Sequence, residues 1–245
     1  MTGPLAQAIA GPRNGLFSAA LAGARSFLLD PVEPPGERAA VAPERRPVVA
    51  IFGLARGCGS TVVARALAVE LAARDTAGAS AVACEAKVVG IPLATQAAAR
   101  LARAVADVPG HARAVGRLCL VGGVDPPRLA EAVRGVAPVV IDAGSSLLGG
   151  VPACVADRTV IVTTPAVEPA LARVASECVA RVGREPILVV NRARRDGEPG
   201  RELRGETAVR LPESRMGAQL ALGGREARGD LGRAIAELAD RCDDD

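Results

Sequence analysis

The chain has 245 residues, of which 49% are hydrophobic and only 1% aromatic, so its core is expected to consist of closely packed Ala, Val, Leu and Ile. The 30 basic and 27 acidic residues are mixed along the sequence, and this balance, together with the lack of aromatic platforms for stacking bases, argues against direct sequence-specific binding of nucleic acid. Six scattered cysteines without a CxxC pair, and a single histidine, predict neither a zinc site nor a disulfide framework.

Apolar residues recur at helical spacing from Leu16 to Leu28 and predict an amphipathic helix over residues 14–29. Its first interpretation is a helix docked on the domain or on a partner, its second a peripheral membrane-surface helix, and its third a signal peptide. No apolar run approaches the roughly 20 residues needed to cross a bilayer. The protein is therefore expected in the cytoplasm, with peripheral contact to the inner face of the membrane as the alternative.

A stretch rich in Pro, Glu and Arg follows this helix and ends at Pro47. Such a composition is typical of a linker. We therefore predict an N-terminal helix and flexible linker over residues 1–46, and one α/β domain over residues 47–245.

From Pro47 onward, short β-branched runs alternate with longer runs rich in Ala, Leu and Arg. This pattern is typical of a doubly wound α/β fold, with a mostly parallel sheet of about seven strands and helices on both faces. The predicted strands are 48–52, 81–84, 118–121, 139–142, 159–163, 187–191 and 208–211. The predicted helices are 60–74, 93–105, 127–134, 168–182 and 230–241, and residues 192–205 are predicted to form a polar loop.

The first predicted strand runs directly into a glycine-rich segment, GLARGCGST at residues 53–61, and then into an apolar-periodic helix. A strand, a glycine loop and a helix start together present free backbone N–H groups and a positive helix end to an anion. Gly57 and Gly59 would let the backbone approach a phosphate closely, and Thr61 is placed to offer its hydroxyl to a metal ion. The alternative is a tight βα turn capped by Ser60 that binds nothing.

Two nucleotide-binding folds fit this loop. Read as GxxxGxG, with Glu85 after the second predicted strand as a ribose ligand, the loop resembles that of the short-chain dehydrogenases. Catalysis in that family needs a tyrosine, which the chain lacks. Read as a P-loop, Gly59, Ser60 and Thr61 occupy the places of G-K-T in GxxxxGK[ST].

Four later segments favour the P-loop interpretation. They are VVIDAG at 139–144, with Asp142 at a strand end as in a Walker B motif, then VIVTTP at 160–165, ILVVNR at 187–192 and VRLPES at 209–214. In this order and at these spacings they resemble the MinD/ParA family of P-loop ATPases of the SIMIBI class, particularly its CpaE-like members. The resemblance extends from residue 47 to residue 242.

The resemblance implies ATP and Mg²⁺ as cofactors, bound between the subunits of a homodimer or of a heterodimer with a related ATPase. It implies a metal site at Thr61 and Asp142, and a base site at which Asn191 contacts adenine and Pro212 closes the pocket. Glu85 stands where the family has an aspartate that orients the attacking water, so Glu85 and Asp142 are the candidate catalytic residues. The candidate cofactor-binding residues are Arg56, Gly57, Cys58, Gly59, Ser60, Thr61, Asn191, Arg192 and Pro212.

The chain departs from the family pattern at two cationic positions, which makes its Walker A motif degenerate. Ser60 stands at the Walker lysine, and Ala55 at the second lysine, which in the family reaches across the dimer. Phosphoryl transfer depends on neutralising the charge that develops on the γ-phosphate, so these losses predict a rate lower by orders of magnitude. Arg56 would be a partial substitute, although its planar head does not sit where a lysine does.

The segment in which family members carry a γ-phosphate switch is also altered, since residues 93–115 are interpreted as an Ala- and Arg-rich helix without an acidic switch motif.

Three hypotheses about function remain. The first is a MinD/ParA-like ATP-binding protein with weak or absent hydrolysis, acting in cellular positioning, partitioning or assembly. The second is a non-enzymatic pseudo-ATPase scaffold, and the third is an NAD(P)-binding reductase-like protein.

Overall fold

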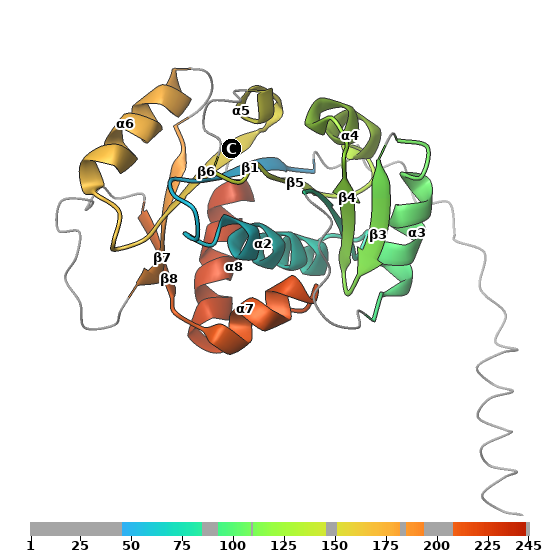
Figure 1. The fold of residues 1–245 in the computed structure, drawn as a ribbon. Helices are drawn as coiled ribbons and strands as arrows, with labels where there is room; N and C mark the ends of the chain where they lie inside the picture. The colour runs from blue at the N-terminus through green and yellow to red at the C-terminus, as the bar shows by residue number, and fades with distance from the viewer. Residues whose placement is uncertain are drawn as a thin grey trace, which may run out of the picture. The chain divides into compact units, whose positions relative to one another are not determined.

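The computed structural model describes residues 46–84, 93–108, 110–145, 151–181, 185–193 and 208–243. The predicted helix over 14–29 and Glu85 lie outside the described residues, and the division of the chain at residues 46 and 47 stays a prediction. The described strands form one sheet of eight, in the order β3-β4-β2-β5-β1-β6-β7-β8 (Figure 1).

The strands are β1 (Val48–Gly53), β2 (Ser80–Ala83), β3 (His111–Val115), β4 (Leu118–Gly122), β5 (Val139–Asp142), β6 (Arg158–Thr163), β7 (Ile187–Ala193) and β8 (Ala208–Pro212). The helices are α2 (Ser60–Arg74), α3 (Gln96–Ala104), α4 (Pro126–Val133), α5 (Val151–Val155), α6 (Pro169–Ala180), α7 (Arg215–Leu222) and α8 (Gly229–Asp243). All neighbouring strands pair in parallel except β3, which is antiparallel to β4. The predicted α/β class and mostly parallel sheet are confirmed.

Strand β1 lies at the centre of the sheet, between β5 and β6. Its side chains alternate between two buried clusters: Val49 and Ile51 face one, and Val48, Ala50 and Phe52 face the other. Helices α2, α7 and α8 cover the first face, and α3, α4, α5 and α6 cover the second (Figure 1). Small aliphatic side chains fill both layers, as the composition predicts.

Helix α2 is buried along most of its length because it lies against the sheet and is flanked by α7 and α8. Its buried positions run nearly without a break from Val63 to Ala72. A helix that is apolar on all sides is one enclosed by other elements. Alanine at many of these positions lets the neighbouring backbones approach closely, and α2 is thereby fixed rigidly behind the loop that precedes it.

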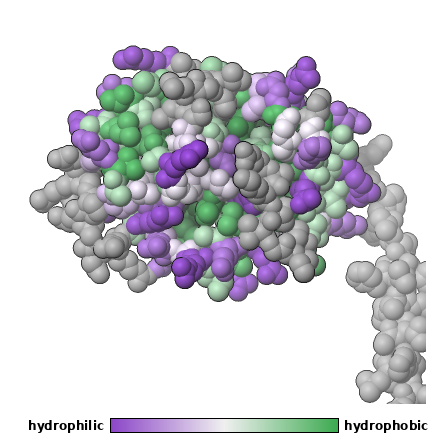
Figure 2. All heavy atoms as spheres, viewed as in Figure 1, coloured by the Kyte–Doolittle hydropathy of each residue, from purple (hydrophilic) through white to green (hydrophobic). Residues whose placement is uncertain are grey.

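Helix α6 is packed on one side only. Ala175 and Val179 contact Ile161 of β6, while Leu171 and Val174 are 46% and 55% exposed. Figure 2 shows the resulting apolar area over α6.

The structure corrects the sequence prediction in three places. Residues 93–115 are not one helix, because α3 covers only Gln96–Ala104 and residues 111–115 form the edge strand β3. Two short helices, α5 and α7, were absent from the prediction. The predicted loop over 192–205 begins too early, because β7 continues to Ala193, and residues 194–205 lie outside the described residues.

Strand β3 escapes recognition because its HARAV sequence has no run of β-branched residues, and its first three side chains are exposed. Its pairing with β4 comes from the tight turn at Gly116, which has a φ of +54°. Across the described residues, no helix has both the length and the apolar character that a membrane span requires.

Candidate functional site

The glycine loop connects β1 to α2 at the point where the strand order changes direction. Ligands of open α/β sheets bind at such switch points, beyond the carboxyl ends of the strands. The loop is pinned on both sides of β1: the Gly53 N–H donates to the Gly144 carbonyl at 2.6 Å, and the Leu54 N–H donates to the Val162 carbonyl at 2.9 Å. The ends of β5 and β6 therefore hold the loop in place.

Helix α2 begins without a side-chain cap. Its N-cap residue is Gly59, with a φ of +89°, and its first turn carries no acidic residue. The first backbone bond at this end runs from the Val63 N–H to the Gly59 carbonyl at 3.0 Å, so the N–H groups of Ser60 and Thr61 remain available. By contrast, the Thr95 and Ser214 hydroxyls cap α3 and α7. Ser60 therefore does not cap this turn, contrary to that part of the alternative interpretation.

The two glycines of the loop differ in what surrounds them. Gly57 has a φ of +79° and no atom within 4 Å of where a Cβ would stand. A Cβ on Gly59 would lie 2.4 Å from Asn191 Nδ2. Gly57 is thus required by its backbone conformation alone, whereas Gly59 is required by its conformation and by the close approach of β7.

Asn191 joins the end of β7 to the loop. Its Nδ2 donates to the Cys58 carbonyl at 2.8 Å, and its Oδ1 accepts from the Arg192 N–H at 2.9 Å. Arg192 has a φ of +57°, and it is the one residue other than glycine with positive φ in the described chain. Such a conformation in a long side chain is sparsely populated and is often found at functional sites.

Asp142 and Thr61 supply oxygen atoms beside the loop. Asp142 ends β5, is paired in register with Ile51 of β1, and accepts a 3.2 Å hydrogen bond from the Gly144 N–H on Oδ1. Thr61 lies half-buried in the first turn of α2. Carboxylate and hydroxyl oxygens are hard ligands, and Mg²⁺ is usually held by one or two protein ligands together with phosphates and water. The donor set at these two residues fits that metal.

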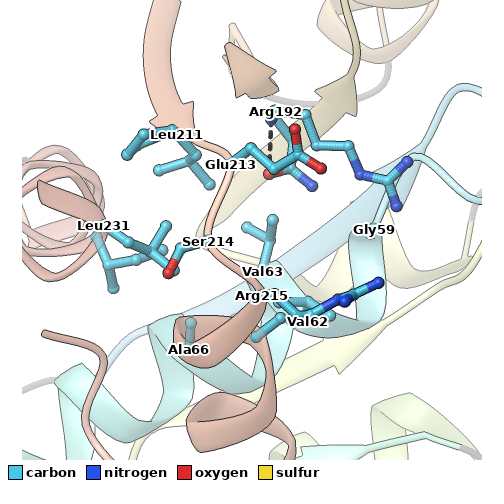
Figure 3. Close-up of a pocket in the computed structure, with 14 residues that line it drawn as sticks. Gly59, Val62, Val63, Ala66, Arg192, Leu211, Glu213, Ser214, Arg215 and Leu231 are labelled. Carbon is cyan, nitrogen blue, oxygen red and sulfur yellow. Dashed lines mark hydrogen bonds between the residues drawn. The ribbon is translucent and has the colours of Figure 1, made fainter. Parts of the chain in front are cut away.

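A pocket of about 380 Å³ opens next to the loop (Figure 3). It extends from Gly59 along α2 to Ala66 and is closed by the β8–α7 connection and by α8. Its floor is apolar and its mouth carries a few polar groups, the usual composition of a ligand pocket. The lining residues are Gly59, Val62, Val63, Ala66, Asn191, Arg192, Leu211, Pro212, Glu213, Ser214, Arg215, Ala218, Leu231 and Ile235.

Most of the residues selected from the sequence lie around this region. The loop is bonded through its first residue, Gly53, to Gly144 after β5, and Gly59, Asn191, Arg192 and Pro212 line the pocket. Arg56 is exposed, whereas Cys58 is 3% exposed and its carbonyl accepts the hydrogen bond from Asn191. The place of Glu85 lies outside the described residues.

Sequence reasoning missed two parts of the pocket. The wall formed by α7 and α8, with Leu231 and Ile235, comes from helices that follow the last recognised motif. Arg215 is the first residue of α7, and the signal that marks it is Ser214, whose Oγ accepts from the Gly217 N–H at 3.0 Å as a helix cap.

No protein-family model matches the chain, and no curated protein matches its sequence. Solved structures share its fold. A ParA family ATPase from Chlorobium tepidum TLS has a TM-score of 0.56 at 15% identity, and the match covers 79% of this chain and 97% of that one. MinD from Pyrococcus horikoshii OT3, complexed with Mg-ADP, has a TM-score of 0.55 at 18% identity over 80% of this chain and 95% of that one.

A putative plasmid partition protein from Borrelia burgdorferi B31, bound to AMPPNP, has a TM-score of 0.55 at 11% identity over 81% of this chain and 98% of that one. These identities are too low to carry residue roles, but the matches span almost the full length of each structure. The chain has the fold of the MinD and ParA P-loop ATPases.

Proposed function

We propose that the chain is a MinD/ParA-like protein that binds ATP with Mg²⁺, hydrolyses it slowly or not at all, and acts in cellular positioning, partitioning or assembly. The proposal rests on one observation, which is that the loop and the pocket meet at Gly59. The uncapped start of α2 meets the mouth of an apolar pocket at this residue. An anion-binding helix end beside an apolar pocket is the arrangement that a nucleotide needs.

Each part of the site has a role in this proposal. The N–H groups of Gly57, Gly59 and Ser60 would donate to the phosphates, and the base would enter the pocket against Asn191 and Pro212. Thr61 and Asp142 would hold Mg²⁺, which neutralises phosphate charge when bound. Two of the solved structures with this fold contain Mg-ADP or AMPPNP, which supports ATP as the ligand to test first.

Slow hydrolysis is proposed because neither lysine position of the loop carries a positive charge. Ser60 and Ala55 are neutral, and the one cation of the loop, Arg56, has an exposed side chain. Removing a single preorganised group that stabilises transition-state charge typically lowers the rate by about 10²–10³. The same observation favours a second candidate, a pseudo-ATPase scaffold that keeps the fold without the chemistry.

The remaining parts of the proposal concern assembly and place. A dimer, either of two copies or with a related ATPase, would bring a second loop to the nucleotide and would allow an active relative to supply a missing cation. Location in the cytoplasm, with or without peripheral membrane contact, is proposed on the same family resemblance.

Thermal unfolding of the purified protein with ATP and Mg²⁺, ADP and Mg²⁺, or NADH tests the proposal, because a ligand that binds only the native state raises the Tm. We expect a rise with ATP that requires Mg²⁺ and that Thr61→Ala and Asp142→Ala remove. Asp107→Ala, an exposed position after α3, is the matched control. A rise with NADH alone would contradict the proposal in favour of a reductase-like protein.

Partner binding separates the two candidates. If the nucleotide is a switch, Thr61→Ala and Asp142→Ala should also abolish dimer or partner association. If the protein is a scaffold, association should persist in both variants.

A further inference from the structure

Two arginines from different elements lie at the mouth of the pocket. Arg192 belongs to the end of β7, Arg215 is the first residue of α7, and both line the pocket together with Gly59. Figure 3 shows both guanidinium groups extending toward the Gly59 end of the pocket, whereas Leu211 and Leu231 lie at the other end. A ligand that reaches from the apolar floor to the loop would therefore pass between two positive charges.

Neither guanidinium group is neutralised by another part of the chain that the structure describes. Among the described residues, Arg192 and Arg215 make no ion pair and no side-chain hydrogen bond, and the Glu213 carboxylate at the same mouth is not paired with either. Some arginines of the described chain are paired with carboxylates, for example Arg233 with Asp230. Both groups can therefore accept an anion without breaking an existing contact.

The backbone fixes the origin of both side chains. The Arg192 N–H is bonded to Asn191, whose amide is bonded in turn to the loop carbonyl of Cys58. The Ser214 cap holds the first turn of α7, where Arg215 begins. The backbone positions of both exposed side chains are thus fixed relative to the loop. This lowers the conformational entropy lost when a ligand binds.

We propose that Arg192 and Arg215 place their positive charges against the nucleotide phosphates, in the role that the absent loop lysines would otherwise have. The inference rests on the proposed nucleotide function. Arginine binds phosphate through two parallel N–H groups, so one guanidinium on each side of the phosphate chain provides charge and orientation. Ser60 and Ala55 leave this role vacant in the loop itself.

The position of the arginines also determines which phosphates they contact. Both lie on the pocket side of Gly59, where the ribose would emerge, so they reach the inner phosphates rather than the γ-phosphate. The site should therefore bind ADP and ATP with similar affinity. A nucleotide held in this way stays bound even though no cation of the loop contacts the γ-phosphate. This arrangement is consistent with slow hydrolysis.

Calorimetric titration of the full chain with ATP, ADP and adenosine tests the inference, using Arg192→Ala, Arg215→Ala, the double variant and Arg210→Ala as control. Arg210 is exposed on β8 and does not line the pocket. We expect each single change to weaken ATP and ADP by about tenfold, the usual order for a lost charge-assisted hydrogen bond. The double variant should lose more than either single variant, adenosine affinity should stay unchanged, and Arg210→Ala should match the wild type.

Three results would overturn the inference. If the wild type binds ATP and the double variant stays within twofold of Arg210→Ala, the arginines do not contact phosphate, although the proposed function stands. A loss for ATP without an equal loss for ADP would contradict contact with the inner phosphates. If the folded wild type binds no nucleotide, the inference and the proposed function both fail. Arg192→Gln and Arg215→Gln replace any alanine variant that does not give native circular dichroism.

Discussion

At the scale of single residues, the loop depends on two glycines for different reasons, and this difference can be measured. Gly57→Ala should destabilise the protein by about 1 kcal/mol, because alanine resists a φ of +79° but meets no atom. Gly59→Ala adds the contact with Asn191 Nδ2 at 2.4 Å, and we expect about 1–3 kcal/mol more. Urea unfolding of both variants gives the difference.

A double-mutant cycle identifies the cause of that excess. In an Asn191→Ala background, Gly59→Ala should cost no more than Gly57→Ala does in the wild type, because the opposing amide is gone. An undiminished excess in that background would show that the loop does not approach β7 as the hydrogen bond between Asn191 and Cys58 indicates.

Ser60 is the residue at which charge can be restored. Ser60→Lys should strengthen ATP binding by about tenfold, because an ammonium group would return to the start of α2 beside the phosphates. The measurement is calorimetric titration, with Ser60→Met as a control for side-chain length. Equal affinities in the two variants would count against the alignment of Gly59, Ser60 and Thr61 with G-K-T.

At the scale of elements, the hairpin of β3 and β4 is joined to the end of α7 by two glycines that cross at close range. A Cβ on Gly116 would lie 2.1 Å from the Gly224 carbonyl oxygen, and one on Gly224 would lie 2.0 Å from the Val115 carbonyl oxygen. The Arg117 N–H also donates to Gly224 at 2.9 Å. Backbone on both sides leaves no flexible atom to give way, so the contact tolerates only glycine.

Gly116→Ala should therefore destabilise the protein by about 3 kcal/mol or more. Gly123→Ala is the matched control, because Gly123 has a similar φ of +69° and no atom within 4 Å of a new Cβ, so only about 1 kcal/mol is expected there. Denaturant midpoints of the two variants decide the matter. Equal losses would mean that the hairpin does not meet α7 in this way.

The same elements show how far the sequence could predict the fold. Every strand with a β-branched, fully buried run was predicted to within about two residues, because burial on both faces demands such runs. Helix α2 was predicted from Ser60 to Arg74, since a glycine loop precedes it and its apolar residues recur at helical spacing. Strand β3 and helices α5 and α7 were not, because they are short and owe their conformation to a turn, a neighbour or a cap.

At the scale of the whole molecule, two of the three buried thiols, one from each core layer, report on how tightly the two faces of the sheet are closed. Cys119 belongs to the layer under α3, α4 and α5, and Cys242 to the layer under α2 and α8. Burial raises the pKa of each thiol from 9.0 to about 12. Above pH 9 the unfolded chain therefore releases protons that the native state keeps.

Stability should consequently be fully retained below pH 9 and fall between pH 9 and about 12, by up to about 1.4 kcal/mol per pH unit for each thiol. Urea unfolding across this range measures the slope, and Cys119→Ala with Cys242→Ala should reduce it. In the native protein, the exposed Cys154 and Cys178 should react with a thiol reagent, while the buried Cys58, Cys119 and Cys242 should not. Rapid labelling of all six cysteines would show that the layers are open.

The site could be predicted from the sequence only in part. Motif order placed Asp142 beside the loop and brought Asn191 and Pro212 to one pocket, because in a parallel sheet the carboxyl ends of strands meet at one edge. The wall made by α7 and α8 and the charge of Arg215 depend on how those helices fold back, which no motif encodes. The loss of the lysines was visible in the sequence, and Arg192 was selected there with its motif, but the place of Arg215 at the same pocket was visible only in three dimensions.

The central claim is that the glycine loop and the adjoining pocket form a nucleotide site, and magnesium-dependent binding of ATP tests it most directly. Calorimetric titration of the purified chain with ATP, ADP and NADH, each with Mg²⁺ and with a chelator, is the measurement. We expect binding of ATP and of ADP that weakens when the chelator removes Mg²⁺, and no binding of NADH. No heat of binding at millimolar ATP, from protein shown to be folded, would contradict the claim and leave a scaffold that has kept the fold alone.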